Sequence, residues 1–359
     1  MSATSTTSAP APTAAAPAPA AAPAAPAPAA STTTAPPRFS YFPGCSADST
    51  GISFTLSTHY VTSLIGIELI EIPDWCCCGT SAAQVTDSEL ALALSARSLA
   101  LSEAANPGLD VVAPCAGCYN ALKRAIHFSR TDEGNRARIE ELIEMPYAAR
   151  ADAYSLLEVM ARPEIRALLE QHITGSLGGL KVASYYGCAL VRPPAICHFD
   201  DVENPQSMDE LMALAGGEPV FWAFKTECCG ASHQISAPAA SRSLIEGIFA
   251  NAVANGAEAI VCACPLCMLN LDLREAEINT ARQRRGQKPF DVPVYYFTEL
   301  LGFVMGGTVR ALGIDRHFWP ALKLCAPKPS PAPTSAPATP AASAPAPTPA
   351  STSAEELAS

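Results

Sequence analysis

The stretch LDVVAPCAGCYNAL (Leu109–Leu122) returns later in the chain as EAIVCACPLCMLNL (Glu258–Leu271). In each copy a short apolar run, typical of a buried strand, leads into Cys-x-x-Cys at the start of a helical pattern. A strand that runs directly into a helix is the unit of a parallel β/α layer. The two stretches therefore predict an α/β fold that is built twice.

Two further blocks repeat around these stretches. FSYFPGC (Phe39–Cys45) parallels VASYYGC (Val182–Cys188), and GIELIEIPDWCCCG (Gly66–Gly79) parallels GGEPVFWAFKTECCG (Gly216–Gly230). Every block is a strand-like run that ends in cysteine, so the cysteines of one copy should meet at the carboxyl edge of one sheet. The first set is Cys45, Cys77, Cys78, Cys115 and Cys118; the second set is Cys188, Cys228, Cys229, Cys264 and Cys267.

The repeats predict two similar β/α domains, at 38–123 and 179–326, which we expect to pack about a pseudo-twofold axis. Helical stretches lie between the blocks at Asp87–Ala105 and Ala240–Asn255. The block PVYYFTELLGFVMG predicts a short strand and an apolar helix that close the second domain.

The segment Arg124–Ile173 is interpreted as having no counterpart after the second copy. Its two parts, EGNRARIEELIEM and DAYSLLEVMARPEIRALLEQHI, are each typical of an amphipathic helix, interrupted or begun at proline. We interpret 124–178 as a helical connector between the domains.

Both ends of the chain, 1–37 and 327–359, are rich in Ala, Pro, Ser and Thr and are predicted to be disordered tethers. The first has no basic start and no continuous apolar run, so it is not typical of a secretory signal. No stretch reaches 18 uninterrupted apolar residues, which predicts a soluble, cytoplasmic protein and no integral membrane span. The net charge of −11 argues against a nucleic-acid-binding surface.

Fourteen cysteines in a chain without an export signal favour metal binding over disulfides. A tetrahedral zinc ion needs four thiolates and would leave one of five unused. A conventional cubane iron–sulfur cluster also uses four. A larger or unusual cluster with a bridging thiolate fits the count of five, so all three alternatives stay open from the residues alone.

The blocks resemble one family specifically, the catalytic B subunit of heterodisulfide reductase with its cysteine-rich CCG domains. The resemblance covers Tyr41 to about Leu322. It is carried by YFPGCS, ELIEIPDW followed by Cys-Cys-Gly, VVAPCAGCYNALK, YYGCALVRPP, FDDVENPQSMDEL, KTECCGAS, ACPLCMLNLDLR and PVYYFTELLG. Cys76 departs from the family pattern, which has another residue before Cys-Cys-Gly.

The resemblance implies that each set of five cysteines binds one noncubane 4Fe–4S cluster, with no catalytic residue beyond the cluster ligands. It implies an oxidoreductase that reduces or forms a small-molecule disulfide by paired one-electron steps, as part of a larger complex. It also implies partners, because the chain has no nucleotide-binding motif of its own. These are an iron–sulfur electron donor like the family's C subunit and a flavin protein like its A subunit.

A second function is compatible with the same domains. Related CCG proteins serve as electron-transfer modules of quinone- or flavin-linked complexes, such as the nonclassical anchor subunit of some succinate:quinone reductases or the iron–sulfur subunits of glycolate and lactate oxidases. Around the sets, Lys225 and His233 are possible proton donors but are more typical of packing or surface residues. The cysteines outside the sets are interpreted as small buried residues: Cys76, Cys197, Cys262 and Cys325.

Overall fold

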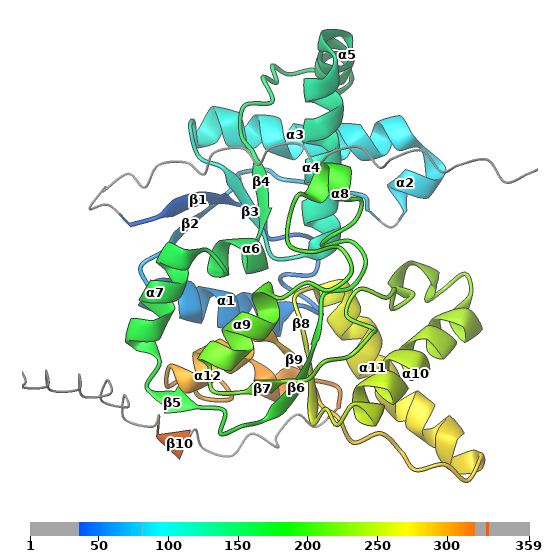
Figure 1. Ribbon diagram of the computed structural model, residues 1–359. Coiled ribbons are helices and arrows are strands. Elements are labelled where there is room, and N and C mark those ends of the chain that lie inside the picture. The colour runs from blue at the N-terminus through cyan, green and yellow to red at the C-terminus, as the bar shows by residue number, and fades with distance from the viewer. Residues whose placement is uncertain (1–35, 81, 320–327, 330–359) are drawn as a thin grey trace, which may run out of the picture. The chain divides into compact units, whose positions relative to one another are not determined.

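The computed structural model describes residues 36–80, 82–319 and 328–329 of the chain. The predicted tails at 1–37 and 327–359 lie almost entirely outside these residues, as does Cys325. Two parallel four-stranded sheets with flanking helices make up the described part, which confirms the predicted α/β class (Figure 1).

The first sheet has the strand order β2-β1-β3-β4, with all neighbours parallel. Its strands are β1 (Arg38–Tyr41), β2 (Glu68–Glu71), β3 (Val111–Ala113) and β4 (Ala153–Ser155). The helices of this half are α1 (Ile52–Leu64), α2 (Ala83–Thr86), α3 (Ser88–Ala105), α4 (Ala116–Thr131), α5 (Glu133–Ile143), α6 (Leu156–Met160) and α7 (Pro163–His172).

The second sheet has the same order in its own numbering, β7-β6-β8-β9, and is again parallel. Its strands are β6 (Lys181–Tyr185), β7 (Glu218–Pro219), β8 (Ala259–Cys262) and β9 (Val294–Tyr296). Its helices are α8 (Pro194–Cys197), α9 (Ser207–Leu214), the 3₁₀ turn η1 (Ala231–His233), α10 (Pro238–Ala254), α11 (Pro265–Arg284), α12 (Phe297–Val304) and the 3₁₀ turn η2 (Ile314–Arg316). A short antiparallel pair joins β5 (Gly175–Ser176) to β10 (Lys328–Pro329).

The prediction that Arg124–Ile173 has no counterpart after the second copy is wrong. Its strand β4 pairs with β3 in the first sheet, as β9 pairs with β8 in the second. Each of these strands ends in the N-cap of a following helix whose third residue is a glutamate that accepts a hydrogen bond from the N-cap backbone amide. Glu158 in α6 completes a capping box with Ser155, and Glu299 in α12 accepts from the amide of Tyr296. Residues 124–131 also continue α4 without a break, so the segment predicted as a connector supplies part of the first β/α layer. The pseudo-twofold relation of the two halves stays a prediction.

The two halves pack against each other at several places, among them α1 and α12, which lie side by side (Figure 1). Phe54 on α1 stacks on Tyr296 with ring centroids 4.2 Å apart, and it meets Phe297 edge-on at 5.9 Å. Beside them, the buried hydroxyl groups of Ser57 and Thr298 lie 2.7 Å apart in a hydrogen bond. This contact continues the hydrophobic core from one sheet to the other.

Among the helices of the described ranges, none is long and apolar enough to cross a membrane.

Candidate functional site

The ten predicted cysteines all stand where strands of the two parallel sheets have just ended. Cys45 follows β1, Cys77 and Cys78 follow β2, and Cys115 follows β3 as the N-cap residue of α4. The second repeat reproduces this plan, with Cys264 as the N-cap residue of α11. Free backbone amides at a helix start favour negative charge, so a Cys-x-x-Cys placed there is held more easily as thiolate.

In the first set, side chains from three separate loops converge. The Sγ atoms of Cys78 and Cys118 lie 3.3 Å apart. Gly44, which precedes Cys45, has φ +80°, and a Cβ there would stand 3.0 Å from Cys118 Sγ. Glycine is required at this position because the backbone adopts a left-handed conformation and passes directly beside a thiol. The amide of Gly79 also points at Cys77 Sγ, with a nitrogen–sulfur distance of 3.5 Å.

The second set has the same geometry. Cys229 Sγ lies 3.7 Å from Cys267 Sγ, and the Gly230 amide nitrogen lies 3.3 Å from Cys228 Sγ. Gly187 has φ +68°, and a Cβ there would stand 3.1 Å from Cys267 Sγ. The same three loops therefore bring the cysteines of each set together, as the repeated blocks predict.

The two sets adjoin one another at their Cys-x-x-Cys turns. A Cβ on Gly117, inside the first turn, would lie 3.5 Å from Leu266 Cδ1, inside the second. Cys115 and Cys264 interact directly, and a hydrogen bond from Cys115 lowers the pKa of the Cys264 thiol while the pKa of Cys115 is raised. The N-termini of α4 and α11, which belong to different repeats, therefore lie next to each other.

Burial follows one pattern in both sets. The first cysteine and the first of the adjacent pair are exposed, namely Cys45, Cys77, Cys188 and Cys228; the other cysteines are buried, except half-buried Cys267. Hydrogen bonds to Cys118 and Cys77 lower the pKa of Cys78 to about 3, and a hydrogen bond to Cys188 lowers that of Cys228 to about 6. Neighbouring thiols therefore stabilise a thiolate at Cys78 in the first set and at Cys228 in the second, whereas hydrogen bonds to neighbouring thiols, together with burial, raise the pKa of Cys77, Cys118 and Cys188.

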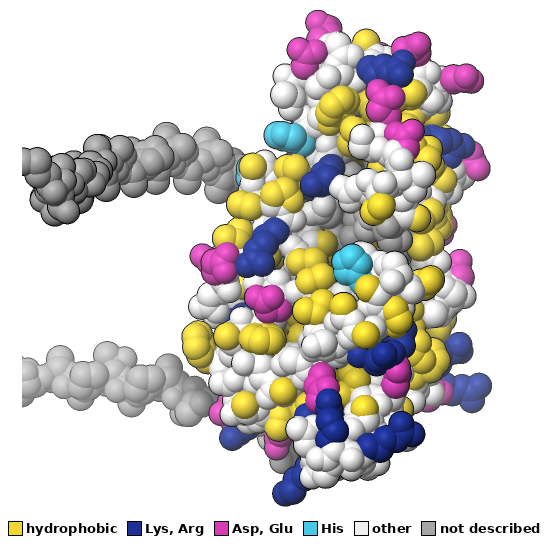
Figure 2. Space-filling model, turned by 90° about the vertical axis from the view of Figure 1, so that its right-hand side faces the viewer, with side chains coloured by type: hydrophobic (Ala, Val, Ile, Leu, Met, Phe, Trp, Pro, Cys, Tyr) yellow, Lys and Arg dark blue, Asp and Glu magenta, His cyan; other side chains and the backbone are white. Residues whose placement is uncertain are grey.

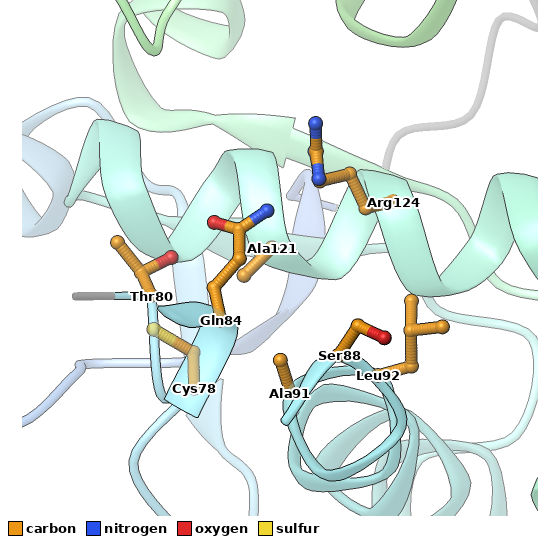
Figure 3. Close-up of a pocket in the computed structure, with 8 residues that line it drawn as sticks. All are labelled: Cys78, Thr80, Gln84, Ser88, Ala91, Leu92, Ala121 and Arg124. Atoms are coloured by element: carbon orange, nitrogen blue, oxygen red, sulfur yellow. The ribbon is translucent and has the colours of Figure 1, made fainter. Parts of the chain in front are cut away.

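A hollow opens beside the sets, lined by residues of both repeats. A cavity of about 110 Å³ has Cys78, Thr80 and Gln84 on one side and Ala121 and Arg124 of α4 on another (Figure 3). A second hollow, of about 560 Å³, shares the lining residues Gln84 and Arg124 and is also lined by Cys188, Asn120 and Arg192. We call these two hollows together the inter-repeat groove. Figure 2 shows the side of the molecule on which α2 lies in Figure 1, where apolar side chains are spread among polar ones.

Comparison with known proteins also finds two cysteine-rich repeats in the chain. The model of the cysteine-rich domain CCG fits the chain twice, at residues 39–123 and 182–272. The membrane anchor subunit of 8-methylmenaquinol:fumarate reductase from Wolinella succinogenes is 31% identical over 289 residues, which are 80% of this chain and 98% of that protein. The chain belongs to the tandem CCG cysteine-rich-domain family.

Other members of the tandem CCG family are heterodisulfide reductase B subunits. The B subunit of the ferredoxin/F420H2-dependent CoB–CoM heterodisulfide reductase of Methanosarcina acetivorans is 28% identical over 286 residues, covering 78% of this chain and 93% of that protein. A B-like protein of Archaeoglobus profundus is 25% identical over 277 residues, covering 75% and 91%. A solved structure of a hypothetical Helicobacter pylori protein has a TM-score of 0.59 at 11% identity, over 79% of this chain and 52% of that one, so the likeness concerns the fold alone.

The donor set of the CCG repeats fits an iron–sulfur group. Every converging ligand is a thiol, which is the ligand that iron–sulfur clusters use. Across the described ranges, no group of three or more His, Cys, Asp and Glu side chains is arranged to hold a single metal ion. Five thiols distributed around each site suit a group larger than one ion.

The structure separates packing residues from site residues near the CCG loops. Lys225 is buried and forms an ion pair with Asp209 and a 2.8 Å hydrogen bond to Pro205 O, so its ammonium group is occupied. His233 is exposed on η1 and lies close enough to Cys228 to help lower the pKa of that thiol. Trp222 is a core residue that donates to Ser184 O.

The cysteines outside the sets make contacts of their own. Cys76 Sγ lies 3.4 Å from Leu94 O, and Cys262 Sγ lies 3.9 Å from Met268 Sδ. Buried Cys197 receives a hydrogen bond from Asn120 at 3.3 Å. These contacts agree with a packing role for the three that the structure describes.

Sequence reasoning missed Asn120 and Arg124 on α4. Both line the inter-repeat groove. Neither residue is repeated at the corresponding position after the second Cys-x-x-Cys. The available signal was their spacing: they lie two and six residues after Cys118, within the first three turns of the helix that begins at the Cys-x-x-Cys.

Proposed function

We propose that this chain is the iron–sulfur component of a multi-subunit oxidoreductase, and that it reduces or forms a small-molecule disulfide in the inter-repeat groove. The two sets of five cysteines would each hold one 4Fe–4S cluster of the noncubane type. The observation that carries the proposal is that the groove is lined by Cys78 of the first set and by Cys188 of the second.

Adjacent sites of this kind suit disulfide chemistry. Reduction of RS–SR to two RSH consumes two electrons and two protons, and breaks one S–S bond. An iron–sulfur cluster supplies one electron at a time, so two clusters supply the pair. The direct contact between the Cys-x-x-Cys turns supports placing both sites within reach of one substrate.

The protein's own residues would bind and orient the substrate. Arg124 reaches both hollows of the groove, and its Nε is buried without a hydrogen-bond partner among the residues that the structure describes. Such a guanidinium group can donate hydrogen bonds to a carboxylate, sulfonate or phosphate group of the substrate. In this proposal His233, which is exposed near Cys228, would give a proton to a departing thiolate at the second set.

The electrons must come from other proteins of the complex. No Rossmann or P-loop motif is present in the sequence, so a flavin or nucleotide site would belong to a partner. We therefore propose that an iron–sulfur protein donates the electrons directly and that a flavin protein supplies them to that donor. Relatives from Methanosarcina are named as B subunits of CoB–CoM heterodisulfide reductases, which supports a complex of several subunits.

A second function is favoured by one specific observation. The relative that is 31% identical over 98% of its length is named as the membrane anchor of an 8-methylmenaquinol:fumarate reductase. On this alternative the same two clusters would transfer electrons within a quinol-linked complex, and no disulfide would react.

One experiment separates the two functions. The protein is purified without oxygen, its iron and sulfide are measured, and electron paramagnetic resonance spectra are recorded after oxidation with and without added thiols. About eight irons per chain and a thiol-dependent signal are expected for disulfide chemistry at two 4Fe–4S clusters. A full iron content with no response to any thiol supports the quinol-linked alternative, whereas a protein without iron contradicts both.

A further inference from the structure

The loop that carries Cys188 is held in place by the opposite repeat. Asn120 of α4 donates its side-chain amide to Ala189 O at 3.0 Å and to Arg192 O at 2.8 Å. Ala189 is the residue next to Cys188, so a hydrogen bond from the first repeat ends one residue from a thiol of the second set. The two hydrogens of this carboxamide are thus shared among the two carbonyl oxygens of the turn 189–192 and Cys197 Sγ, which lies 3.3 Å from the same nitrogen.

Neighbouring contacts hold the same loop on both sides. Tyr119, the residue before Asn120, donates its hydroxyl to Cys197 O at 2.5 Å. From within the second repeat, Arg192 Nη2 donates to Thr226 Oγ1 at 3.0 Å, two residues before Cys228. The Cys188 loop is therefore fixed between the helix that begins at the first set and the Cys-Cys turn of the second.

The second repeat has no equivalent of Asn120. When the two Cys-x-x-Cys motifs are superposed in sequence, Asn120 corresponds to Leu269, whose side chain has no donor. The asparagine that follows it, Asn270, donates to Cys229 O at 2.6 Å and so serves its own repeat. The contact that Asn120 makes with the Cys188 loop therefore has no equivalent at Leu269 of the second repeat.

We propose that Asn120 is a positioning residue that sets the place of Cys188 against the inter-repeat groove and the first set. Its amide links the geometry of the second site to the helix that starts the first. The functional meaning of this link rests on the proposed function, in which both sets hold clusters, but the link itself is a property of the chain.

The test compares cysteine reactivity in the full-length protein purified without oxygen. Iodoacetamide labelling of Cys188 and Cys45, both exposed, is followed by peptide mass spectrometry. Asn120→Leu removes two hydrogen bonds from the loop, so Cys188 should label roughly tenfold faster while Cys45 keeps its rate. Asn120→Asp keeps the side-chain volume, places an acceptor against the two carbonyl groups, and covers the case in which the leucine variant fails to fold.

The matched control is Asn279→Leu on α11. Asn279 is buried, whereas Asn120 is half-buried, and it also bonds a loop twice: it donates to Phe290 O at 2.9 Å and accepts from Phe290 N at 2.6 Å, away from the cysteine loops. It should lose stability without changing either labelling rate. An unchanged rate at Cys188 in both Asn120 variants, or an equal rise at Cys45, overturns the proposal.

Iron content gives a second readout that is independent of activity. If both sets bind clusters, Asn120→Leu should lower iron toward half of the wild-type amount, and adding Cys45→Ser should remove the rest. Full iron retention in Asn120→Leu would contradict the positioning role at the cluster site. A wild-type protein without iron would contradict the proposed function alone, because the labelling result stands apart from it.

Discussion

At Cys76 the thiol lies 3.4 Å from the carbonyl oxygen of Leu94 and 3.8 Å from Ser98 Oγ, both on α3. Its neighbour Cys78 instead meets Cys118 of the Cys-x-x-Cys turn. We therefore expect Cys76→Ser to keep the wild-type iron and sulfide content, since serine can make the same contacts to α3. Cys78→Ser should lose iron from the first set. Iron loss in the Cys76 variant equal to that in the Cys78 variant would show that the set includes the wrong member of the triplet.

Arg124 tests whether the substrate of the groove is an anion. Arg124→Gln removes the charge from a guanidinium group whose buried Nε has no hydrogen-bond partner among the described residues, so KM for an anionic disulfide such as glutathione disulfide should rise about tenfold, with kcat little changed. Steady-state reduction assays with an artificial one-electron donor measure this effect. Arg136→Gln, exposed on α5 and paired with Glu133, is the control. An equal rise in KM for the neutral hydroxyethyl disulfide would contradict an anion contact.

At the scale of the element, α11 combines a site function with an unfavourable buried charge. The helix begins at the second Cys-x-x-Cys, and two turns later it buries Glu275, whose side chain is 0% exposed. Burial, reinforced by Asp272 and Asp291, raises the pKa of Glu275 to about 8. Since the folded state holds this proton more tightly than the unfolded state, stability falls as the pH rises from about 4.5 toward 8.

Glu275→Gln should therefore stabilise the protein increasingly at higher pH. Between pH 6 and pH 8 the gain in unfolding free energy over wild type should grow by roughly 2 kcal/mol, because one pKa unit corresponds to about 1.4 kcal/mol. Urea unfolding followed by circular dichroism at several pH values measures it. A gain that is constant with pH would mean that Glu275 is charged in the folded state throughout this range.

Most elements follow from the sequence because each block couples a strand to a cysteine turn. In the structure β1, β2 and β3 each precede one cysteine turn of the first set, and α3 and α10 lie where helical spacing predicts them. The strand β4 was missed because three extended residues, Ala153–Ser155, run straight into α6 and look like one helix with it. The capping box of Ser155 and Glu158 was the signal that marks the boundary.

At the scale of the whole molecule, sequence repeats predict each half but not how the halves meet. The convergence of each cysteine set follows from the parallel order of three strands, which the repeated blocks indicate. The contacts of Asn120 with Ala189, and of Gly117 with Leu266, depend on the relative orientation of two sheets. No local periodicity encodes that orientation, since it results from the side chains that pack between the repeats.

Phe54 is the residue on which that packing can be tested. It is 2% exposed on α1, stacks on Tyr296 of the second repeat, and so joins the two cores. Phe54→Ala should cost about 3–5 kcal/mol of unfolding free energy, as for other large-to-small core changes. Phe249→Ala is the control, because Phe249 is equally buried but stacks on Phe290 within the second repeat, at 5.4 Å.

The two variants should differ in cooperativity rather than in stability. Unfolding of each half is followed by the fluorescence of Trp75 in a Trp222→Phe, Trp319→Phe background and of Trp222 in a Trp75→Phe, Trp319→Phe background. The two transitions should coincide in wild type and in Phe249→Ala, because the repeats share one core, and should separate in Phe54→Ala. Transitions that stay coincident in Phe54→Ala would place the coupling at the Cys-x-x-Cys turns instead of at α1 and α12, and would make the sites themselves the contact that holds the repeats together.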